Sequence, residues 1–190
     1  MHDDVLAQHA EELIELTAKT IEMHTKTICN IADLIISCLK SGNKVIIAGN
    51  GGSYADACHF AAEIEGSYRD RKRKGMAAMV PGNVASLTAI ANDFGYDNVF
   101  RRNLEALGNK GDIFIGLSTS GNSINLVNAM EFAKENEIIV IAFTGESGGV
   151  MKDCCDVLLN IPSADTPRIQ EMHKFAYHEI CEIVEKEMFK

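Results

Sequence analysis

The chain has 190 residues, of which 46% are hydrophobic and 24% are charged, and its formal net charge is −9. This length and composition fit one globular domain with a single core, and the acidic balance argues against a nucleic-acid binder, which must neutralise phosphates. No apolar run approaches the roughly 18 residues of a membrane span, so we expect neither a nucleic-acid nor a membrane partner.

The first forty residues predict helix. Apolar residues recur at spacings near three and four without an interrupting proline, and Ser41-Gly42-Asn43 ends the run. Two helices or one bent helix both fit the pattern. We treat residues 1–42 as an N-terminal helical segment of the same domain as residues 43–190. This segment forms either an assembly surface or a helix packed on its own sheet, and both interpretations stay open.

From Lys44 onward, short apolar runs alternate with helical patterns. Each run is continuously apolar, which is typical of parallel strands covered on both faces, and strands that alternate with helices indicate a parallel α/β sheet with right-handed crossovers. The predicted strands are 44–48, 76–80, 113–117, 138–143 and 157–161. The predicted helices are 54–66, 83–91, 97–107, 122–135 and 167–189.

A glycine-rich loop follows the first predicted strand. It reads Gly49-Asn50-Gly51-Gly52-Ser53 and opens the next helix. Glycines let the backbone turn tightly and approach a ligand, and a helix start offers free N–H groups and the positive end of its dipole. The loop matches neither a Walker motif nor a G-x-G-x-x-G fingerprint, so the pattern favours an anion site over a nucleotide site.

A serine-rich loop, Ser118-Thr119-Ser120-Gly121-Asn122-Ser123, follows the third predicted strand. Its four hydroxyl groups could surround a phosphate with neutral donors. The alternative is an ordinary N-cap, for which one serine suffices. Because the loop holds more hydroxyls than capping needs and carries no Lys or Arg, we expect it to bind a phosphate for recognition without phosphoryl transfer.

Two further features bear on location and charge. The run Arg69-Asp70-Arg71-Lys72-Arg73-Lys74 is interpreted as a solvated loop, with attraction of an anionic substrate as the alternative. Six cysteines lack C-x-x-C spacing, and the acidic start lacks the order of a signal peptide. We therefore expect reduced, mostly buried thiols in a cytoplasmic protein.

The two loops, in this order, resemble those of the sugar isomerase (SIS) domain family, and the phosphoheptose isomerases within it. The resemblance spans about residues 44 to 190 and covers further motifs. These are Asp56-Ala57-Cys58-His59-Phe60-Ala61-Ala62-Glu63, Ala91-Asn92-Asp93-Phe94-Gly95-Tyr96, Thr144-Gly145-Glu146-Ser147-Gly148-Gly149 and Asp165-Thr166-Pro167-Arg168-Ile169-Gln170-Glu171-Met172-His173. Several motifs in register make the resemblance specific.

The resemblance implies a flavodoxin-like, five-stranded parallel sheet and a homotetramer with active sites at subunit contacts. It also implies conversion of sedoheptulose 7-phosphate to D-glycero-D-manno-heptose 7-phosphate, the first step of ADP- or GDP-heptose synthesis. The implied catalytic pair is Glu63 and His178. The implied zinc ligands are His59, Glu63, Gln170 and His178. The implied substrate contacts are Asn50, Gly51, Gly52, Ser53, Glu63, Asn92, Asp93, Ser118, Thr119, Ser120, Ser123 and Gln170.

The sequence also departs from the family pattern. Where many members carry a basic residue after the glycine that follows the catalytic glutamate, this chain has Ser67, and Arg69 lies two residues further on. The following loop lacks an Arg-Pro pair. These departures bear on sugar preference more than on the isomerase chemistry.

Residue spacing alone also constrains the chemistry. His59 and Glu63 are four apart, so a helix projects both from one face, where they form a metal site, an acid–base couple or an ordinary ion pair. Gln170 and His178 are eight apart, about 12 Å along a helix, which is near the limit for sharing one ion. Either Gln170 lies at the helix start or one ligand crosses a subunit boundary.

Isomerisation through an enediolate needs a group that moves the carbon-bound proton and a partner that handles the oxygen protons. We assign these roles to Glu63 and His178, with zinc polarising the carbonyl. The competing interpretations are a non-catalytic SIS protein that binds the replication initiator DnaA, and a sugar-phosphate sensor. The presence of both Glu63 and His178 favours the enzyme.

Overall fold

The computed structural model describes residues 2–190 and shows a five-stranded, all-parallel sheet in the order β2-β1-β3-β4-β5. The strands are β1 (Val45–Gly49), β2 (Ala78–Met79), β3 (Ile113–Ser118), β4 (Ile139–Thr144) and β5 (Val157–Asn160). This is the flavodoxin-like order, in which strand order reverses between β1 and β3, so the predicted fold class is confirmed. β2 is shorter than predicted because it is an edge strand that stops just before Pro81, which has no N–H to donate.

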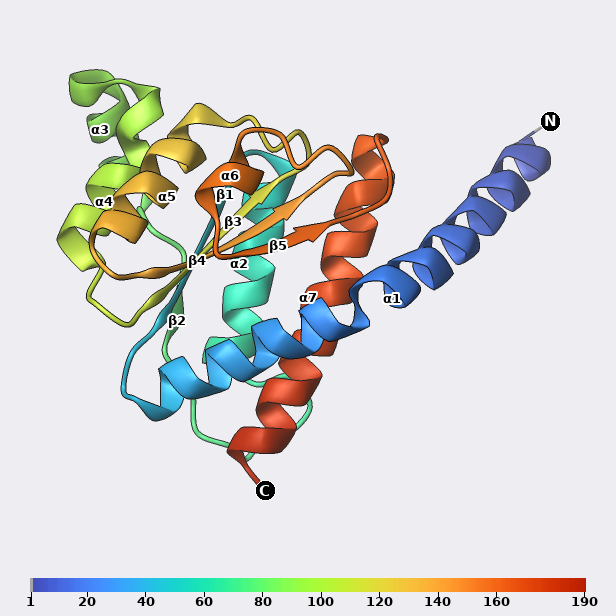
Figure 1. Ribbon diagram of the computed structural model, residues 1–190, viewed down its shortest axis with the longest axis horizontal. Coiled ribbons are helices and arrows are strands. Elements are labelled where there is room, and N and C mark those ends of the chain that lie inside the picture. The colour runs from blue at the N-terminus through green and yellow to red at the C-terminus, as the bar shows by residue number, and fades with distance from the viewer. Residues whose placement is uncertain (1) are drawn as a thin grey trace.

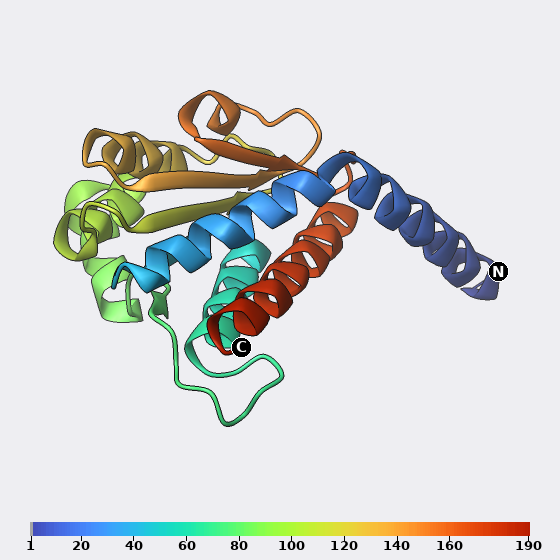
Figure 2. The same ribbon diagram turned by 60° about the horizontal axis from the view of Figure 1, so that its bottom comes forward.

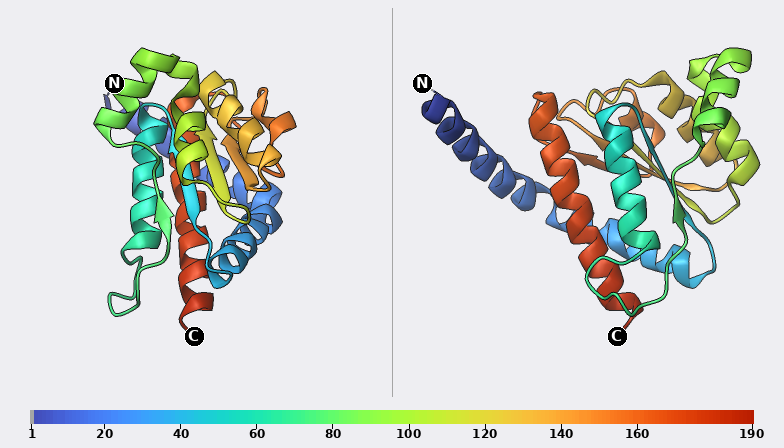
Figure 3. Two further views of the ribbon diagram at one scale, coloured as in Figure 1. Left: turned by 90° about the vertical axis from the view of Figure 1, so that its left-hand side faces the viewer. Right: turned by 180° about the vertical axis from the view of Figure 1, so that it is seen from behind.

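Helices cover both faces of the sheet (Figures 1 and 3). They are α1 (His2–Lys40), α2 (Gly52–Glu65), α3 (Val84–Phe94), the 3-10 turn η1 (Tyr96–Asn98), α4 (Val99–Leu107), α5 (Ile124–Glu135), α6 (Met151–Cys154) and α7 (Thr166–Met188). One core joins α1, α2 and α7 to the sheet, and a second joins α4, α5 and α6 to its other face. Among the helices of residues 2–190, the single turn of α6 is the one that the sequence analysis did not predict.

The N-terminal segment is one continuous helix, which changes direction part-way along (Figure 2). Its second half packs on the sheet, where Ile28, Ile31 and Ile35 are buried in the first core. Its first half projects from the domain, and Leu6 and Ile14 on it are 70% and 69% exposed. The helix therefore packs on its own sheet over one half only and leaves apolar side chains uncovered on the other.

Two expectations about side chains need correction. The loop 69–74 is not wholly solvated, because the Arg73 side chain is fully buried in an ion pair with Glu185. All six thiols are free, but only Cys38 and Cys181 are buried, whereas Cys29 and Cys58 lie exposed. Helical spacing places Cys58 on the outer face of α2, which explains its exposure. None of the helices within residues 2–190 combines the length and apolar character required to cross a membrane.

The amino edge of the sheet is organised by one buried carboxylate. Asp112, just before β3, accepts hydrogen bonds from the backbone N–H of Lys44 (3.0 Å) and of Asn109 (2.8 Å) and pairs with the Lys44 ammonium. Its side chain is 1% exposed. This carboxylate ties the starts of β1 and β3 together.

Replacing this buried carboxylate, by Asp112→Ala, leaves two partly buried backbone N–H groups and the Lys44 ammonium without their partner. We expect a loss of about 3 kcal/mol in the free energy of unfolding, measured by urea denaturation. The exposed Asp33→Ala on α1 is the matched control and should change stability by less than about 0.5 kcal/mol. Equal stabilities of the two variants would contradict this role of Asp112.

Candidate functional site

The glycine loop lies at the carboxyl end of β1 and begins α2. Gly51 is the N-cap residue with φ 56, a left-handed conformation that favours glycine, and no side chain caps the helix. At Gly52, an added Cβ would lie 2.6 Å from Nε2 of Gln170. The backbone of α2 therefore starts uncapped and is bordered by the Gln170 amide, as an anion site at a helix N-terminus requires.

The serine loop lies beside it, at the carboxyl end of β3. The Ser118 hydroxyl is 2.9 Å from that of Ser123 and 3.4 Å from that of Ser120. Ser123 is the N-cap residue of α5, yet its side chain makes no capping hydrogen bond. The hydroxyls thus converge on one another instead of capping the helix, which favours the phosphate-binding interpretation over the capping one.

The two loops are joined by a pair of amides. Asn50 and Asn125 exchange hydrogen bonds of 3.0 and 2.9 Å, and the Tyr96 hydroxyl donates to Asn50 Oδ1 at 2.7 Å. This junction lies between β1 and β3, at the switch point where ligands of such sheets bind. Asn92 and Asp93 are exposed at the end of α3 and bond to each other. The sequence analysis did not predict Asn125 or Tyr96 as site residues. For Tyr96 the sequence did hold a clue, because it ends the family motif of residues 91–96.

The loop between β4 and α6 supports the serine loop from behind. Gly145 N–H donates to the Thr119 carbonyl (3.0 Å), and Met151 N–H donates to the Gly121 carbonyl (2.9 Å). Gly121 has φ 66, and a Cβ there would lie 2.2 Å from the Gly148 carbonyl oxygen. The motif 144–149 therefore has a structural role, because it packs backbone against backbone behind the hydroxyls.

A second cluster lies on the facing sides of α2 and α7. His59, Glu63 and His178 each offer a ligand atom, and these three atoms lie within 4.8 Å of one another. His59 Nε2 is 3.0 Å from Glu63 Oε1, and the two imidazole rings have centroids 5.1 Å apart. The structure thus brings Glu63 and His178 together from distant parts of the chain.

The ring of His59 is fixed by Tyr177, which sequence reasoning missed. The Tyr177 hydroxyl lies 3.0 Å from His59 Nδ1, and its ring stacks on Phe60. Burial, followed by the charge of the neighbouring Asp56, raises the pKa of Tyr177 well above its usual range, so the hydroxyl stays protonated. In the tautomer of His59 that carries its proton on Nδ1, that N–H donates to the Tyr177 oxygen and Nε2 is free to act as a ligand atom beside Glu63.

The donor set fits a metal ion. Two imidazoles and a carboxylate are ligands that Zn²⁺ takes in catalytic sites, where three protein ligands leave one position open. The 3.0 Å distance between His59 Nε2 and Glu63 Oε1 is satisfied either by a shared proton or by a cation bound to both atoms. Burial, and next the neighbouring His59, lower the pKa of His178, which favours the neutral imidazole that a metal needs.

Gln170 lies toward the first turn of α2, and its predicted place among the metal ligands stays a prediction. Its amide lies against Gly52, near the start of α7, and His59 is seven residues along α2 from Gly52, about 10 Å by helical rise. Glu63 lies about 16 Å along the same helix. The phosphate loops with Gln170 and the carboxylate–imidazole cluster therefore occupy different parts of α2.

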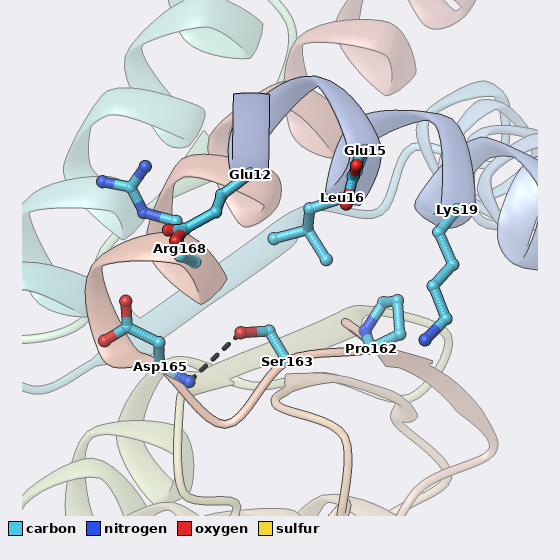
Figure 4. A pocket seen from close by; sticks show the side chains of 8 residues that line it. All are labelled: Glu12, Glu15, Leu16, Lys19, Pro162, Ser163, Asp165 and Arg168. Atoms are coloured by element: carbon cyan, nitrogen blue, oxygen red, sulfur yellow. Dashed lines mark hydrogen bonds between the residues drawn. The ribbon is translucent and has the colours of Figure 1, made fainter. Parts of the chain in front are cut away.

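A separate hollow of about 320 Å³ lies between α1 and the segment that leads into α7 (Figure 4). Side chains of both charges line it, among them Lys19, Glu12 and Arg168, and Arg168 also donates to the His9 carbonyl (3.3 Å). It contains none of the predicted site residues. We therefore attribute it to the packing of α1 and not to chemistry.

Fold and site together define a parallel α/β domain with two loops suited to an anion at one edge of the sheet and a His–Glu–His cluster suited to a metal ion. The SIS domain model matches residues 8–145. Phosphoheptose isomerase from Aliarcobacter butzleri is 47% identical over 92% of each chain, and that from Geobacter metallireducens is 42% identical over the full length of both. A phosphoheptose isomerase structure from Neisseria gonorrhoeae superposes with a TM-score of 0.92 at 38% identity, covering 98% of this chain and all of its own. The chain belongs to the SIS domain family, on the branch of the phosphoheptose isomerases, and the resemblance seen in the sequence is confirmed.

Removal of the Tyr177 hydroxyl tests the metal-competent cluster. Tyr177→Phe keeps the ring on Phe60 but frees His59 to rotate, so we expect a 10- to 100-fold loss of Zn²⁺ affinity with little change in the unfolding temperature, measured by calorimetric titration. Tyr68→Phe, whose ring also lies near His178, is the control and should bind Zn²⁺ normally. Equal affinities of the two variants would show that Tyr177 does not orient a ligand.

Proposed function

We propose that this protein is an aldose–ketose isomerase that converts sedoheptulose 7-phosphate to D-glycero-D-manno-heptose 7-phosphate, the first step of nucleotide-activated heptose synthesis. The observation that carries the proposal is the meeting of Glu63 and His178, 115 positions apart in the chain, in one partly exposed cluster. Relatives that share 42 to 51% of aligned residues are named phosphoheptose isomerases. The glycine loop and the serine loop together supply the hydrogen-bond donors for a phosphate.

The reaction exchanges a proton between C1 and C2 of the open-chain sugar. Glu63, as a carboxylate, takes the carbon-bound proton and returns it to the adjacent carbon, which balances the isomerisation without a redox partner. His178, largely neutral because its pKa is lowered, handles the proton of the sugar oxygens. Ser118, Ser120 and Ser123 hold the phosphate with neutral donors, so the sugar is anchored far from the reacting carbons.

We infer that the cluster holds Zn²⁺, with His59, Glu63 and His178 as ligands from one chain. A bound zinc ion supplies Lewis-acid polarisation of the sugar oxygens and stabilises negative charge that develops there. Tyr177 fixes the tautomer and the orientation of His59 as a ligand. Glu63 is also the proposed base, so its carboxylate must be released toward the sugar when substrate arrives.

We further propose that each active site is shared between two subunits. From C2 to phosphorus the sugar spans seven bonds of about 1.5 Å, at most ~11 Å, whereas Glu63 lies about 16 Å along α2 from the phosphate loops. Even a fully stretched sugar is shorter than this rise between backbone positions, so one chain could bridge it only with the added reach of its side chains. A neighbouring subunit can instead bring its His59–Glu63–His178 cluster to the loops directly, and the Gln170 amide beside Gly52 then completes the ligand set.

The exposed apolar residues supply contact surfaces for this assembly, which we propose is a homotetramer. Leu6 and Ile14 are exposed on the projecting half of α1, Val84 and Phe94 are exposed on α3, and Ile124 is exposed directly after the serine loop. Apolar patches of this kind mark interaction sites in proteins. All six cysteines are free thiols, which suits the reducing cytoplasm as the compartment.

A coupled assay with sedoheptulose 7-phosphate tests the function. Glu63→Gln should bind the sugar but lose turnover about 10²- to 10⁴-fold, and Ser120→Ala should raise KM about tenfold by loss of one donor to a charged phosphate, with unfolding midpoints unchanged. Ser41→Ala, an exposed serine remote from the loops, is the control. Normal turnover by Glu63→Gln would remove Glu63 as the base, and a native protein that binds without turnover would be a sensor.

Subunit mixing tests the shared site. Glu63→Gln and Ser120→Glu should each be nearly inactive alone, the second by repulsion of the phosphate. Refolded together, random mixed oligomers should regain about a quarter of native activity, because a loop of one subunit then meets an intact cluster of another. Mixed oligomers, verified by mass, that stay inactive would place each site within a single chain.

A further inference from the structure

Arg73 stands out among the buried charges because its side chain is completely inaccessible to solvent. Its Nε donates to the carboxylate of Glu185 on α7, and its Nη1 donates to the Lys74 carbonyl at 3.0 Å. Its Nη2 donates to the backbone carbonyl of Glu63 at 2.6 Å. One guanidinium therefore connects the last turn of α2, the loop 66–77 and the C-terminal half of α7.

Glu185 is held equally firmly from the loop side. Its carboxylate accepts hydrogen bonds from the backbone N–H groups of Tyr68, Arg69 and Asp70, at 2.8 to 2.9 Å. Burial alone would raise the pKa of Glu185, but the Arg73 guanidinium and these donors hold it at about 2. The pair is thus fully ionised at neutral pH, and every strong acceptor position of the carboxylate is used.

The position of this ion pair relative to the cluster is the informative feature. Glu63 directs its carboxylate toward His178. Its backbone carbonyl, in the final turn of α2, accepts the hydrogen bond from Arg73. Glu185 lies seven residues, or two turns, after His178 on α7. The Arg73–Glu185 ion pair thus links α2, which carries Glu63, to α7, which carries His178.

Stability alone does not require a buried ion pair at this position. Burial of two charges costs desolvation energy that their attraction barely offsets, and apolar residues of similar volume often serve stability as well or better. The planar fork of arginine, in contrast, fixes direction as well as charge, which lysine cannot do. The geometry favours a role that depends on precise placement.

We propose that Arg73 is a positioning residue for the isomerisation: through the Glu63 carbonyl and Glu185 it sets the separation of the Glu63 carboxylate from His178. The proposal rests on the proposed function for its catalytic readout. Misplacement of a reacting group by about 1 Å can cost roughly 10²-fold in rate, so small losses of register on α2 or α7 should lower kcat while phosphate binding, and hence KM, is kept.

The experiment compares Arg73→Lys with the double variant Arg73→Met/Glu185→Leu, which removes both charges and keeps apolar volume. We expect kcat to fall about 10- to 100-fold in both, with KM within about twofold of native. The double variant leaves no unpaired charge, but the N–H groups of residues 68–70 lose their acceptor. Its unfolding temperature should therefore fall, and kcat is measured well below that temperature. Arg101→Lys, at an exposed ion pair on α4, is the matched control and should leave kcat and unfolding temperature unchanged.

Zn²⁺ affinity gives a readout that does not depend on turnover. Looser register between α2 and α7 should weaken Zn²⁺ binding about tenfold or more in both variants, even if the native protein proves to act on a different sugar. Native kcat and native Zn²⁺ affinity in a folded double variant would overturn the proposal and leave the pair a stability feature. If Arg73→Lys fails to fold, the double variant alone decides between the two outcomes.

Discussion

The length of α2 is the constraint on which the chemistry of this protein depends. Its first turn begins at the glycine loop, and its last two turns carry His59 and Glu63, so one rigid helix separates the proposed phosphate-binding loop from the proposed proton-transfer groups. A helix cannot shorten to bring its ends together. We therefore propose that a second copy of the chain brings its cluster to the loops, and this assembly would also cover the apolar side chains that are exposed on α1 and α3.

Both ends of α2 are held by polar contacts that cross between elements. At the start, the Asn50–Asn125 amide pair joins the two loops, and the backbone of the 144–149 segment supports the serine loop. At the end, Arg73 and Glu185 join α2 to α7. Between them, Tyr177 links α7 to His59. The placement of these side chains thus depends on a few directional hydrogen bonds and ion pairs. The apolar core, in contrast, tolerates hydrophobic substitutions that keep its volume.

The sequence was sufficient for the fold and for the position of the glycine and serine loops, because those features have local signatures, whereas phosphate binding by the loops stays a prediction. Continuous apolar runs marked the strands, and glycine or serine clusters at their carboxyl ends marked the loops. The meeting of Glu63 with His178 came from family resemblance and not from spacing. Tyr177, Asn125 and Arg73 were missed for a common reason: each acts through one contact with a residue far away in the chain, and each looks locally ordinary. Arg73 in particular was hidden in a run of charges whose other members suggested a solvated loop.

The most direct test is a structure of the Glu63→Gln variant with sedoheptulose 7-phosphate bound. We expect the phosphate among the hydroxyls of residues 118–123 of one subunit. We expect C1 and C2 to lie within about 3.5 Å of the side chain at position 63 in a neighbouring subunit, with the attached sugar oxygens within hydrogen-bond distance of His178 of that subunit. A sugar whose first two carbons lie away from both groups in every subunit would contradict the shared site and the proton transfer assigned to it.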